Sequence, residues 1–342
     1  MVGLDPKADT GTGLEQLDPV LVLAPVRGIT DAVYRGAFAR CFGGFDCAVA
    51  PFIQLKQGQA LRAAELRQVA PVENKGLWTI PQVLTNHAPT LSAALRELHS
   101  AGHGEVNWNL GCPQPMTAGR GRGAGLLPDP ERIDTILAQV LADCPVKLSV
   151  KMRLGYHQPD EYVAVMEVLN RYPLSGVILH ARTADQQYEG VVDVNRAAQA
   201  LALCRHPFIY NGDIADAGAF LELRTKLSGT AGWMIGRGAL ASPFLPSRIK
   251  GKDVPGSDER RQRLLEFHRQ LCEGYSLWLS GPGHWLDRMK EQWAYLALSF
   301  ADPKQVVSRI RHSGTINRYT SAVEWVFEHV LLGSSGTVPN GA

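Results

Sequence analysis

Short apolar runs alternate with helical patterns between about Pro19 and Ala241. Continuous apolar runs are typical of strands that are buried on both faces of a parallel sheet. Eight such runs occur: Val20–Ala24, Phe45–Ala50, Ile80–Leu84, Val106–Leu110, Val146–Val150, Gly176–Leu179, Pro207–Tyr210 and Ala231–Ile235. Helix-like stretches separate them, such as Thr90–Ala101, Asp129–Cys144, Pro159–Tyr172 and Asp216–Leu227. This alternation predicts an α/β fold, a (β/α)8 TIM barrel.

A doubly wound sheet is the competing layout. It would normally carry a glycine-rich dinucleotide-binding turn after its first strand. Here the first predicted strand continues into Pro25-Val26-Arg27-Gly28, which lacks that spacing. The barrel is therefore the favoured interpretation.

The pattern changes after about Pro246, where no strand-like run follows. Four helical stretches separated by Gly, Pro and Asp predict a helical bundle behind the barrel. They are Asp258–Leu279, His284–Phe300, Pro303–Gly314 and Asn317–Leu332. We therefore predict three parts: an N-terminal extension (1–18), a barrel domain (19–245) and a C-terminal helical bundle domain (246–342).

Composition and charge narrow the classes of protein to which this chain can belong. The net charge is only +2, so any nucleic-acid surface must be local. The six cysteines form no C-x-x-C pair, which argues against a zinc site or a disulfide framework and favours a cytoplasmic protein. No apolar run approaches the roughly 20 residues that span a bilayer. Met1–Leu17 lacks an apolar stretch, so we expect a loosely attached extension and no signal peptide.

Polar residues cluster where the predicted strands end. In a (β/α)8 barrel the chemistry is located on the loops that follow the carboxyl ends of the strands. Taken singly, each of these residues is more simply a turn residue or a solvated charge, but seven of eight strands contribute. The set comprises Arg27, Gln82, Asn109, Cys112, Lys151, Arg153, His180, Arg182, Asn211, Asp213 and Arg237.

Cys112 differs from the other cysteines because it lies in a Gly/Pro turn after a strand. The glycine-rich stretch 118–125 follows it, and we expect this stretch to be flexible over the barrel mouth. Gly212 and Gly236 follow the last two strands, the usual place of a phosphate site in this fold, and Arg237 adds positive charge. A phosphate-bearing cofactor is therefore expected, and FMN fits because no dinucleotide motif is present.

These segments resemble the tRNA-dihydrouridine synthase family. The matching motifs run in family order along the whole predicted barrel: LAP at 23–25, NLGCP at 109–113, GRGAGLL at 121–127, VKMRLG at 150–155, HART at 180–183, NGD at 211–213 and IGRG at 235–238. The helical segment 288–293 (RMKEQW) resembles the branch that modifies uridine 16 of the tRNA D-loop.

The resemblance implies a mechanism and roles for residues. Reduced FMN would deliver hydride to C6 of a uracil, and Cys112 would protonate C5 as general acid, with NADPH or NADH as reductant. The implied cofactor-binding residues are Pro25, Val26, Arg27, Gln82, Lys151, His180, Asn211, Gly212, Asp213, Gly236 and Arg237. The residues predicted to orient the uracil are Asn109, Arg153, Arg182 and Tyr188. No metal is expected, and we expect a monomer.

A uridine in folded RNA must be extruded to reach a buried flavin, and contacts with the RNA backbone must offset that cost. The predicted contacts are Arg120, Arg122, Arg288, Lys290, Arg309 and Arg311. Two other functions share these features. One is a flavin-dependent oxidoreductase of a free pyrimidine-like metabolite, which would not need a basic helical domain. The other is a non-catalytic RNA-binding protein, for which Cys112 would be dispensable.

Overall fold

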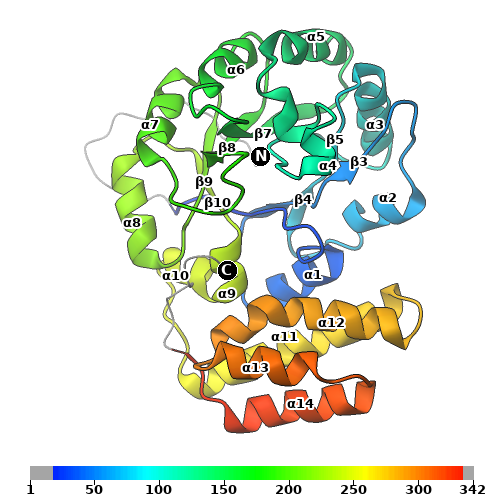
Figure 1. Cartoon of the computed structure of the whole chain (residues 1–342), viewed down its shortest axis with the longest axis vertical. Helices are drawn as coiled ribbons and strands as arrows, with labels where there is room; N and C mark the ends of the chain where they lie inside the picture. The colour runs from blue at the N-terminus through cyan, green and yellow to red at the C-terminus, as the bar shows by residue number, and fades with distance from the viewer. Residues whose placement is uncertain (1–17, 334–342) are drawn as a thin grey trace.

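A ten-stranded parallel sheet, closed into a barrel, forms the centre of the molecule (Figure 1). The computed structural model describes residues 18–333. The strands are β1 (Leu21–Leu23), β2 (Cys47–Val49), β3 (Ile53–Gln54), β4 (Trp78–Ile80), β5 (Gln82–Leu84), β6 (Glu105–Leu110), β7 (Lys147–Gly155), β8 (Gly176–Thr183), β9 (Phe208–Asn211) and β10 (Gly232–Ile235). Their order in the sheet is β3-β5-β6-β7-β8-β9-β10-β1-β2-β4.

The sheet closes through a strand that Pro81 divides. β4 pairs with β2, while β5 pairs with β3 and β6, and only Pro81 separates β4 from β5. Proline has no N–H to give to the ladder, but its carbonyl still accepts a hydrogen bond from the Asn107 backbone at 2.8 Å. Because β4 and β5 are the two halves of one barrel strand, the two ends of the order meet. The predicted TIM barrel is confirmed, and the doubly wound sheet is excluded.

Apolar side chains fill one part of the barrel interior. Strand side chains alternate between the two faces, so every second residue points inward. The inward cluster consists of Val22, Ala24, Cys47, Val49, Ile80, Ile178, Ile209 and Met234. β5, β6 and β7 add no residue to this cluster and carry buried polar side chains instead. That asymmetry locates the candidate site.

Helices surround the barrel: α1 (Ala32–Cys41), α2 (Ala63–Val69), α3 (Ala88–Ser100), α5 (Pro130–Leu141), α6 (Tyr162–Leu169), α7 (Val194–Leu203) and α8 (Ala217–Lys226). Several begin at an aspartate whose carboxylate accepts a backbone N–H of the first turn. Asp129 does so for α5, Asp193 for α7 and Asp216 for α8. Short helices lie within the loops: α4 (Pro115–Ala118), η1 (Gly123–Leu126), α9 (Arg237–Ala241) and α10 (Leu245–Ile249).

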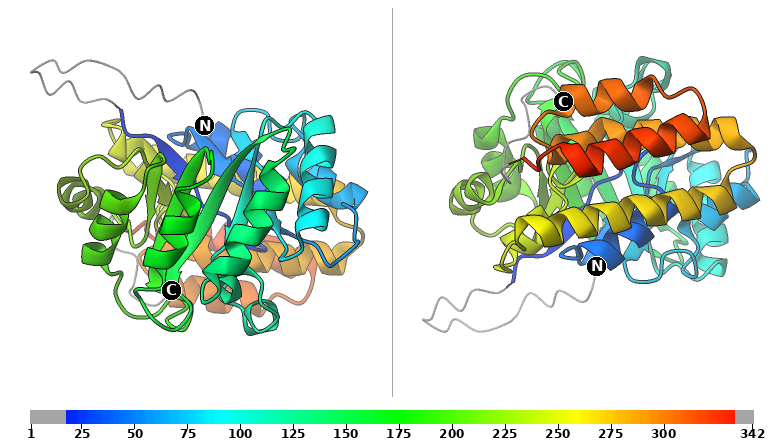
Figure 2. Two further views of the ribbon diagram at one scale, coloured as in Figure 1. Left: turned by 90° about the horizontal axis from the view of Figure 1, so that it is seen from above. Right: turned by 90° about the horizontal axis from the view of Figure 1, so that it is seen from below.

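Four helices and a short 3-10 turn form the C-terminal bundle: α11 (Ser257–Trp278), α12 (Pro282–Leu296), η2 (Ala297–Ser299), α13 (Pro303–Arg311) and α14 (Ile316–His329). Figure 2 shows the bundle lying along one side of the barrel. α11 packs on α1, where Phe267 contacts Tyr34 at 5.3 Å and Phe42 at 5.1 Å between ring centroids. One continuous apolar core runs from the barrel into the bundle, so the domain boundary near residue 245 stays a prediction.

Within residues 18–333, no helix is long and apolar enough to cross a membrane. The same residues contain no group of three or more His, Cys, Asp or Glu side chains that could hold a metal ion. The predicted loose N-terminal extension falls almost entirely on residues 1–17, outside the described residues.

Candidate active site

A chain of hydrogen-bonded polar side chains crosses the barrel interior beneath its mouth. Ser149 Oγ accepts from Asn107 Nδ2 at 3.0 Å, and Asn107 Oδ1 accepts from Gln82 Nε2 at 2.7 Å. Gln82 Oε1 in turn accepts from Asn109 Nδ2 at 2.8 Å. Gln82 and Asn107 are fully buried. Buried amides need such partners, because an unpaired one costs about 1–3 kcal/mol.

Asn109 determines the backbone position of Cys112. Its Oδ1 accepts the N–H of Gly111 at 3.0 Å and that of Cys112 at 2.9 Å. Sequence analysis predicted that Asn109 orients a uracil. Here its carboxamide already bridges Gln82 and the turn that carries the thiol, so it also acts as a support of that turn.

The Cys112 thiol is buried, with 7% of the residue exposed. Burial raises its pKa, and hydrogen bonds from the Gln114 backbone and the Thr117 side chain, together with the positive charges of Arg153 and Arg27, partly oppose that shift. The net direction keeps the thiol protonated at neutral pH, which is the state that a proton donor requires.

The glycine-rich stretch after Cys112 is folded, and the expectation of a flexible loop was wrong. It forms α4 and η1, and the Ala124 N–H donates to the Cys112 carbonyl at 3.1 Å. Asn86 Nδ2 donates to the carbonyls of Arg120 at 3.1 Å and Gly121 at 2.9 Å. These long-range bonds, which composition does not reveal, give the stretch one conformation.

Basic side chains gather from the middle to the carboxyl ends of β7 and β8, because both strands continue past Lys151 and His180, where the sequence pattern had predicted their ends. Burial, and then the charge of Arg153, lower the pKa of Lys151 to about 7, with Cys112 acting in the opposite direction. The pKa of His180 lies well below its usual value because of burial and then the charges of Arg153 and Lys151. Arg182 Nη1 lies 3.2 Å from His180 Nε2. Since a guanidinium can only donate, that nitrogen accepts and the imidazole is neutral.

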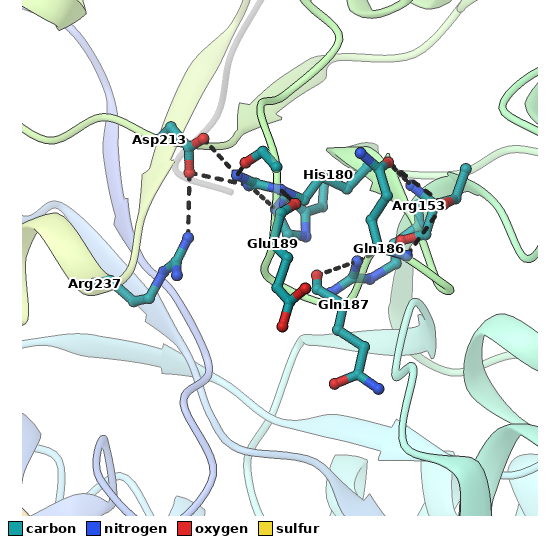
Figure 3. A network of polar contacts seen from close by, with 10 residues as sticks. Arg153, His180, Gln186, Gln187, Glu189, Asp213 and Arg237 are labelled. Atoms are coloured by element: carbon teal, nitrogen blue, oxygen red, sulfur yellow. Dashed lines mark hydrogen bonds and ion pairs between the residues drawn. The ribbon is translucent and has the colours of Figure 1, made fainter. Parts of the chain in front are cut away.

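Arg153, which Figure 3 shows, and Arg182 are both buried, and they hold the segment from the end of β8 toward α7 by its carbonyl groups. Arg153 Nη1 donates to Thr183 O at 2.7 Å and Gln187 O at 2.6 Å. Arg182 donates to Glu189 O at 3.1 Å and Gly190 O at 2.7 Å. Both were predicted to contact the uracil; the structure gives each a positioning role in this loop.

Asp213 brings the ends of β8, β9 and β10 together (Figure 3). Its carboxylate pairs with Arg182 at 2.6 Å and with Arg237 at 3.3 Å. Asn211 Nδ2 donates to the Met234 carbonyl at 2.9 Å, and Gly212 is buried beside it. A Cβ on Gly236 would lie 3.3 Å from Ala24 Cβ, so the last strand end also adjoins the first.

Tyr188 is an exposed aromatic residue of this mouth, with 50% of its surface accessible. Arg153 and Arg237 lie at 5.3 and 5.5 Å from its ring centroid, and its ring centroid is 6.3 Å from that of His180. An exposed aromatic ring held at the edge of a cationic mouth is suited to stacking on a planar ligand.

The first strand contributes the segment Pro25–Thr30, which turns back into α1. The Val26 N–H donates to Thr30 Oγ1 at 2.9 Å, and the Thr30 hydroxyl lies 3.2 Å from the Ala24 carbonyl. Arg27 is exposed, with its guanidinium 5.6 Å from the centroid of Phe52. The Val26 N–H is therefore already bonded within the loop.

The predicted RNA-contacting residues are dispersed. Arg120 is exposed on the thiol side, while Arg122 has two guanidinium nitrogens that are buried without a partner in the described residues. Arg288 donates to the Gly28 carbonyl and pairs with Glu291 at 3.2 Å. Lys290 is half-buried on α12. Arg309 and Arg311 are exposed on α13, and the Arg309 guanidinium lies 3.7 Å from the centroid of the Trp325 ring.

Sequence analysis missed the interior residues Asn107 and Ser149, and the loop contacts of α11 and α12. The sequence does point to Asn107 and Ser149. Asn107 lies two residues before Asn109, and Ser149 lies two residues before Lys151, and side chains two residues apart share one face of a strand. The contacts between the bundle and the β1–α1 loop had none, because they join residues about 260 positions apart.

The fold and the site define a barrel enzyme whose mouth combines a protonated thiol with a cluster of cations. Comparison with known proteins supplies the family. The dihydrouridine synthase family model matches residues 22–284. A probable tRNA-dihydrouridine synthase of Rhodobacter capsulatus is 30% identical over 78% of this chain and 82% of its own length. A tRNA-dihydrouridine(16) synthase of Cupriavidus necator is 31% identical over 81% and 90%.

Among solved structures, histamine dehydrogenase from Rhizobium sp. 4-9 has a TM-score of 0.51 at 10% identity, covering 74% of this chain and 49% of its own, which supports the barrel fold alone. The chain belongs to the dihydrouridine synthase family, and its relatives include several tRNA-dihydrouridine(16) synthases. The predicted family and enzyme class, a tRNA-dihydrouridine synthase, are confirmed.

Proposed function

We propose that this protein reduces the C5–C6 double bond of uridine 16 in the D-loop of tRNA, with FMN as its cofactor. The observation that carries the proposal is the buried, protonated Cys112 thiol close to the charges of Lys151 and Arg153. Several named relatives act, by name, at position 16 of tRNA, which supports the choice of uridine.

The residues present fit an anionic, phosphate-bearing cofactor. Lys151, Arg153, Arg182 and Arg237 bring four basic side chains to one mouth, and Asp213 pairs with two of them. Burial and mutual repulsion lower the pKa values of Lys151 and Arg153, and the attraction of a bound anion for the charged forms would oppose that shift. In the proposal, Lys151, His180 and Gln82 hold the ring of FMN, with Pro25, Val26 and Arg27 along its other side. Asn211, Gly212, Asp213, Gly236 and Arg237 hold its ribityl phosphate.

In the proposed reaction the chain's own residues orient the uracil and move one proton. Reduced FMN, when bound, would supply a hydride to C6, and NADPH or NADH would supply the reducing equivalents. Cys112 donates its proton to C5, and the thiolate then takes a proton from water. Asn109 holds the turn that carries Cys112, while Arg153 and Arg182 hold the loop that presents Tyr188 to the base.

The test is turnover with tRNA that lacks dihydrouridine, using purified protein, FMN and NADPH. The wild-type protein should bind FMN and form dihydrouridine at position 16. Cys112→Ala should lower turnover by roughly 10²–10⁴-fold, the usual contribution of a general acid, and leave FMN and tRNA binding intact. Turnover equal to that of the wild-type protein would remove Cys112 as the acid, and a protein that never binds flavin would remove the function.

A further inference from the structure

Three consecutive carbonyl groups of the β1–α1 loop each accept a hydrogen bond from a side chain. Arg35 Nη1, from α1, donates to Thr30 O at 2.6 Å. Gln292 Nε2 donates to Ile29 O at 3.3 Å, and Arg288 Nη1 donates to Gly28 O. Gln292 and Arg288 lie on α12, in the C-terminal bundle. The loop that leaves the first barrel strand is therefore held from outside the barrel.

Gln292 is a buried donor and belongs to a network. Gln292 is 3% exposed and Tyr275, on α11, is 1% exposed. The second bond of Gln292 Nε2 goes to the Tyr275 hydroxyl at 2.8 Å, and that hydroxyl donates to Asp31 Oδ1 at 3.1 Å. Asp31 is the N-cap of α1 and accepts the Tyr34 N–H at 3.0 Å. Gln292 and Tyr275 therefore connect the bundle to the β1–α1 loop and to the N-cap residue of α1.

The loop is also fixed from its inner side. The N–H groups of Ile29 and Thr30 both donate to Val26 O at 3.0 Å. A Cβ on Gly236 would lie 3.9 Å from Val26 Cγ2, so the loop adjoins the end of β10. α12 also packs against α9, the short helix after β10. One helix of the bundle therefore supports two neighbouring segments of the candidate site.

We propose that α11 and α12 complete the active site, with Gln292, Tyr275 and Arg288 as positioning residues that hold the β1–α1 loop against the cofactor. The inference rests on the proposed function, because it takes Pro25–Arg27 as part of the FMN site. It gives Arg288 a different role from the RNA contact predicted from the sequence, since its Nη1 donates to Gly28 O and pairs with Glu291.

Two tyrosines of the bundle provide a matched test. Tyr275→Phe removes a buried hydroxyl that reaches the loop network. Tyr319→Phe removes another, which accepts from Trp293 Nε1 at 2.8 Å and lies 2.7 Å from His268 Nε2, and which has no bond to the loop. Gln292→Leu removes both donors to Ile29 O and Tyr275 at similar side-chain volume. All three variants should lose some thermal stability, so stability alone does not separate them.

The first readout is amide hydrogen exchange of residues 26–31 in the protein without FMN. Tyr275→Phe and Gln292→Leu should exchange faster there than wild type, and Tyr319→Phe should match wild type. The second is FMN affinity, which should fall about tenfold for Gln292→Leu and stay unchanged for Tyr319→Phe. A spectral shift of bound FMN should accompany the loss.

Two results would overturn the inference: unchanged exchange at 26–31 in both loop variants, or an equal loss of FMN affinity in Tyr319→Phe. A wild-type protein that binds no FMN would defeat the proposed function instead. The exchange measurement needs no cofactor, so it would still decide whether the bundle holds the loop.

Discussion

Lys151 illustrates how a buried residue can be poised for a ligand. Its pKa is lowered from 10.5 to about 7, chiefly by burial and then by Arg153. It extends from the same face of β7 as Ser149 and Arg153, so its side chain points toward the polar interior. An amine in that setting is partly neutral at physiological pH, and a neighbouring anion would return it to the charged form.

The pH dependence of stability tests this state in the cofactor-free protein. Below pH 7 both folded and unfolded chains carry the proton on Lys151. Between pH 7 and about 10.5 the unfolded chain binds it more strongly, so the free energy of unfolding should rise with pH in that window. We expect Lys151→Met to lose this rise. Chemical denaturation at pH 6 to 9 measures it, with the exposed Lys147→Met as control; parallel curves for wild type and Lys151→Met would contradict the assignment.

At the scale of elements, the turn from β6 through η1 determines where the thiol lies. Gly123 opens η1 with a φ of +57°, and a Cβ there would lie 2.9 Å from both Cys112 Cβ and Cys112 O. Neither atom can move without shifting Cys112, the proposed proton donor, or its backbone. The glycine is therefore needed for both its backbone conformation and the close approach.

Gly123→Ala should lower turnover at least tenfold by displacing Cys112, with little change in FMN affinity. Gly102→Ala is the matched control, since Gly102 has a φ of +95° and a Cβ added there would meet no atom within 4 Å. It shares the backbone strain and lacks the steric conflict. The two rates of dihydrouridine formation decide the matter: similar losses in both variants would attribute the effect to general strain.

The strands and loops also show which parts of the candidate site the sequence can predict. The sequence pattern predicted Cys112, Lys151, His180 and Asn211 at one rim, because the carboxyl ends of parallel strands share an edge. In the structure β7 continues to Gly155 and β8 to Thr183, so Lys151 and His180 lie within their strands. The sequence could not predict that Arg153 and Arg182 donate hydrogen bonds to loop carbonyls, because such bonds depend on the path of residues 183–190. It equally could not foresee that Asn109 supports the thiol turn, since the same amide fits a ligand contact.

At the scale of the whole molecule, the bundle presents a groove between α13 and α14, the two helices that Figure 1 places farthest from the barrel. The groove is lined by Gln305, Ser308, Arg309, His312, Ser313, Asn317, Arg318, Ser321 and Ala322. Among these residues, no side chain is acidic. A substrate as large as tRNA could span the distance from this groove to the barrel mouth, and the groove is our candidate for its phosphate backbone.

Salt dependence separates the bundle's arginines by role. Each phosphate contact contributes roughly 0.7–0.9 to the slope of log affinity against log salt concentration. Arg309→Gln combined with Arg318→Gln should therefore lower the slope for tRNA binding by the contribution of up to about two phosphate contacts, because both side chains line the groove and are exposed. Arg288→Gln should leave the slope unchanged and weaken FMN binding instead, since its guanidinium is bonded to Gly28 O. Titrations by fluorescence anisotropy between 50 and 200 mM salt, roughly the range in which such slopes are measured, distinguish the two. The opposite pattern would make Arg288 the RNA contact and place the tRNA elsewhere on the bundle.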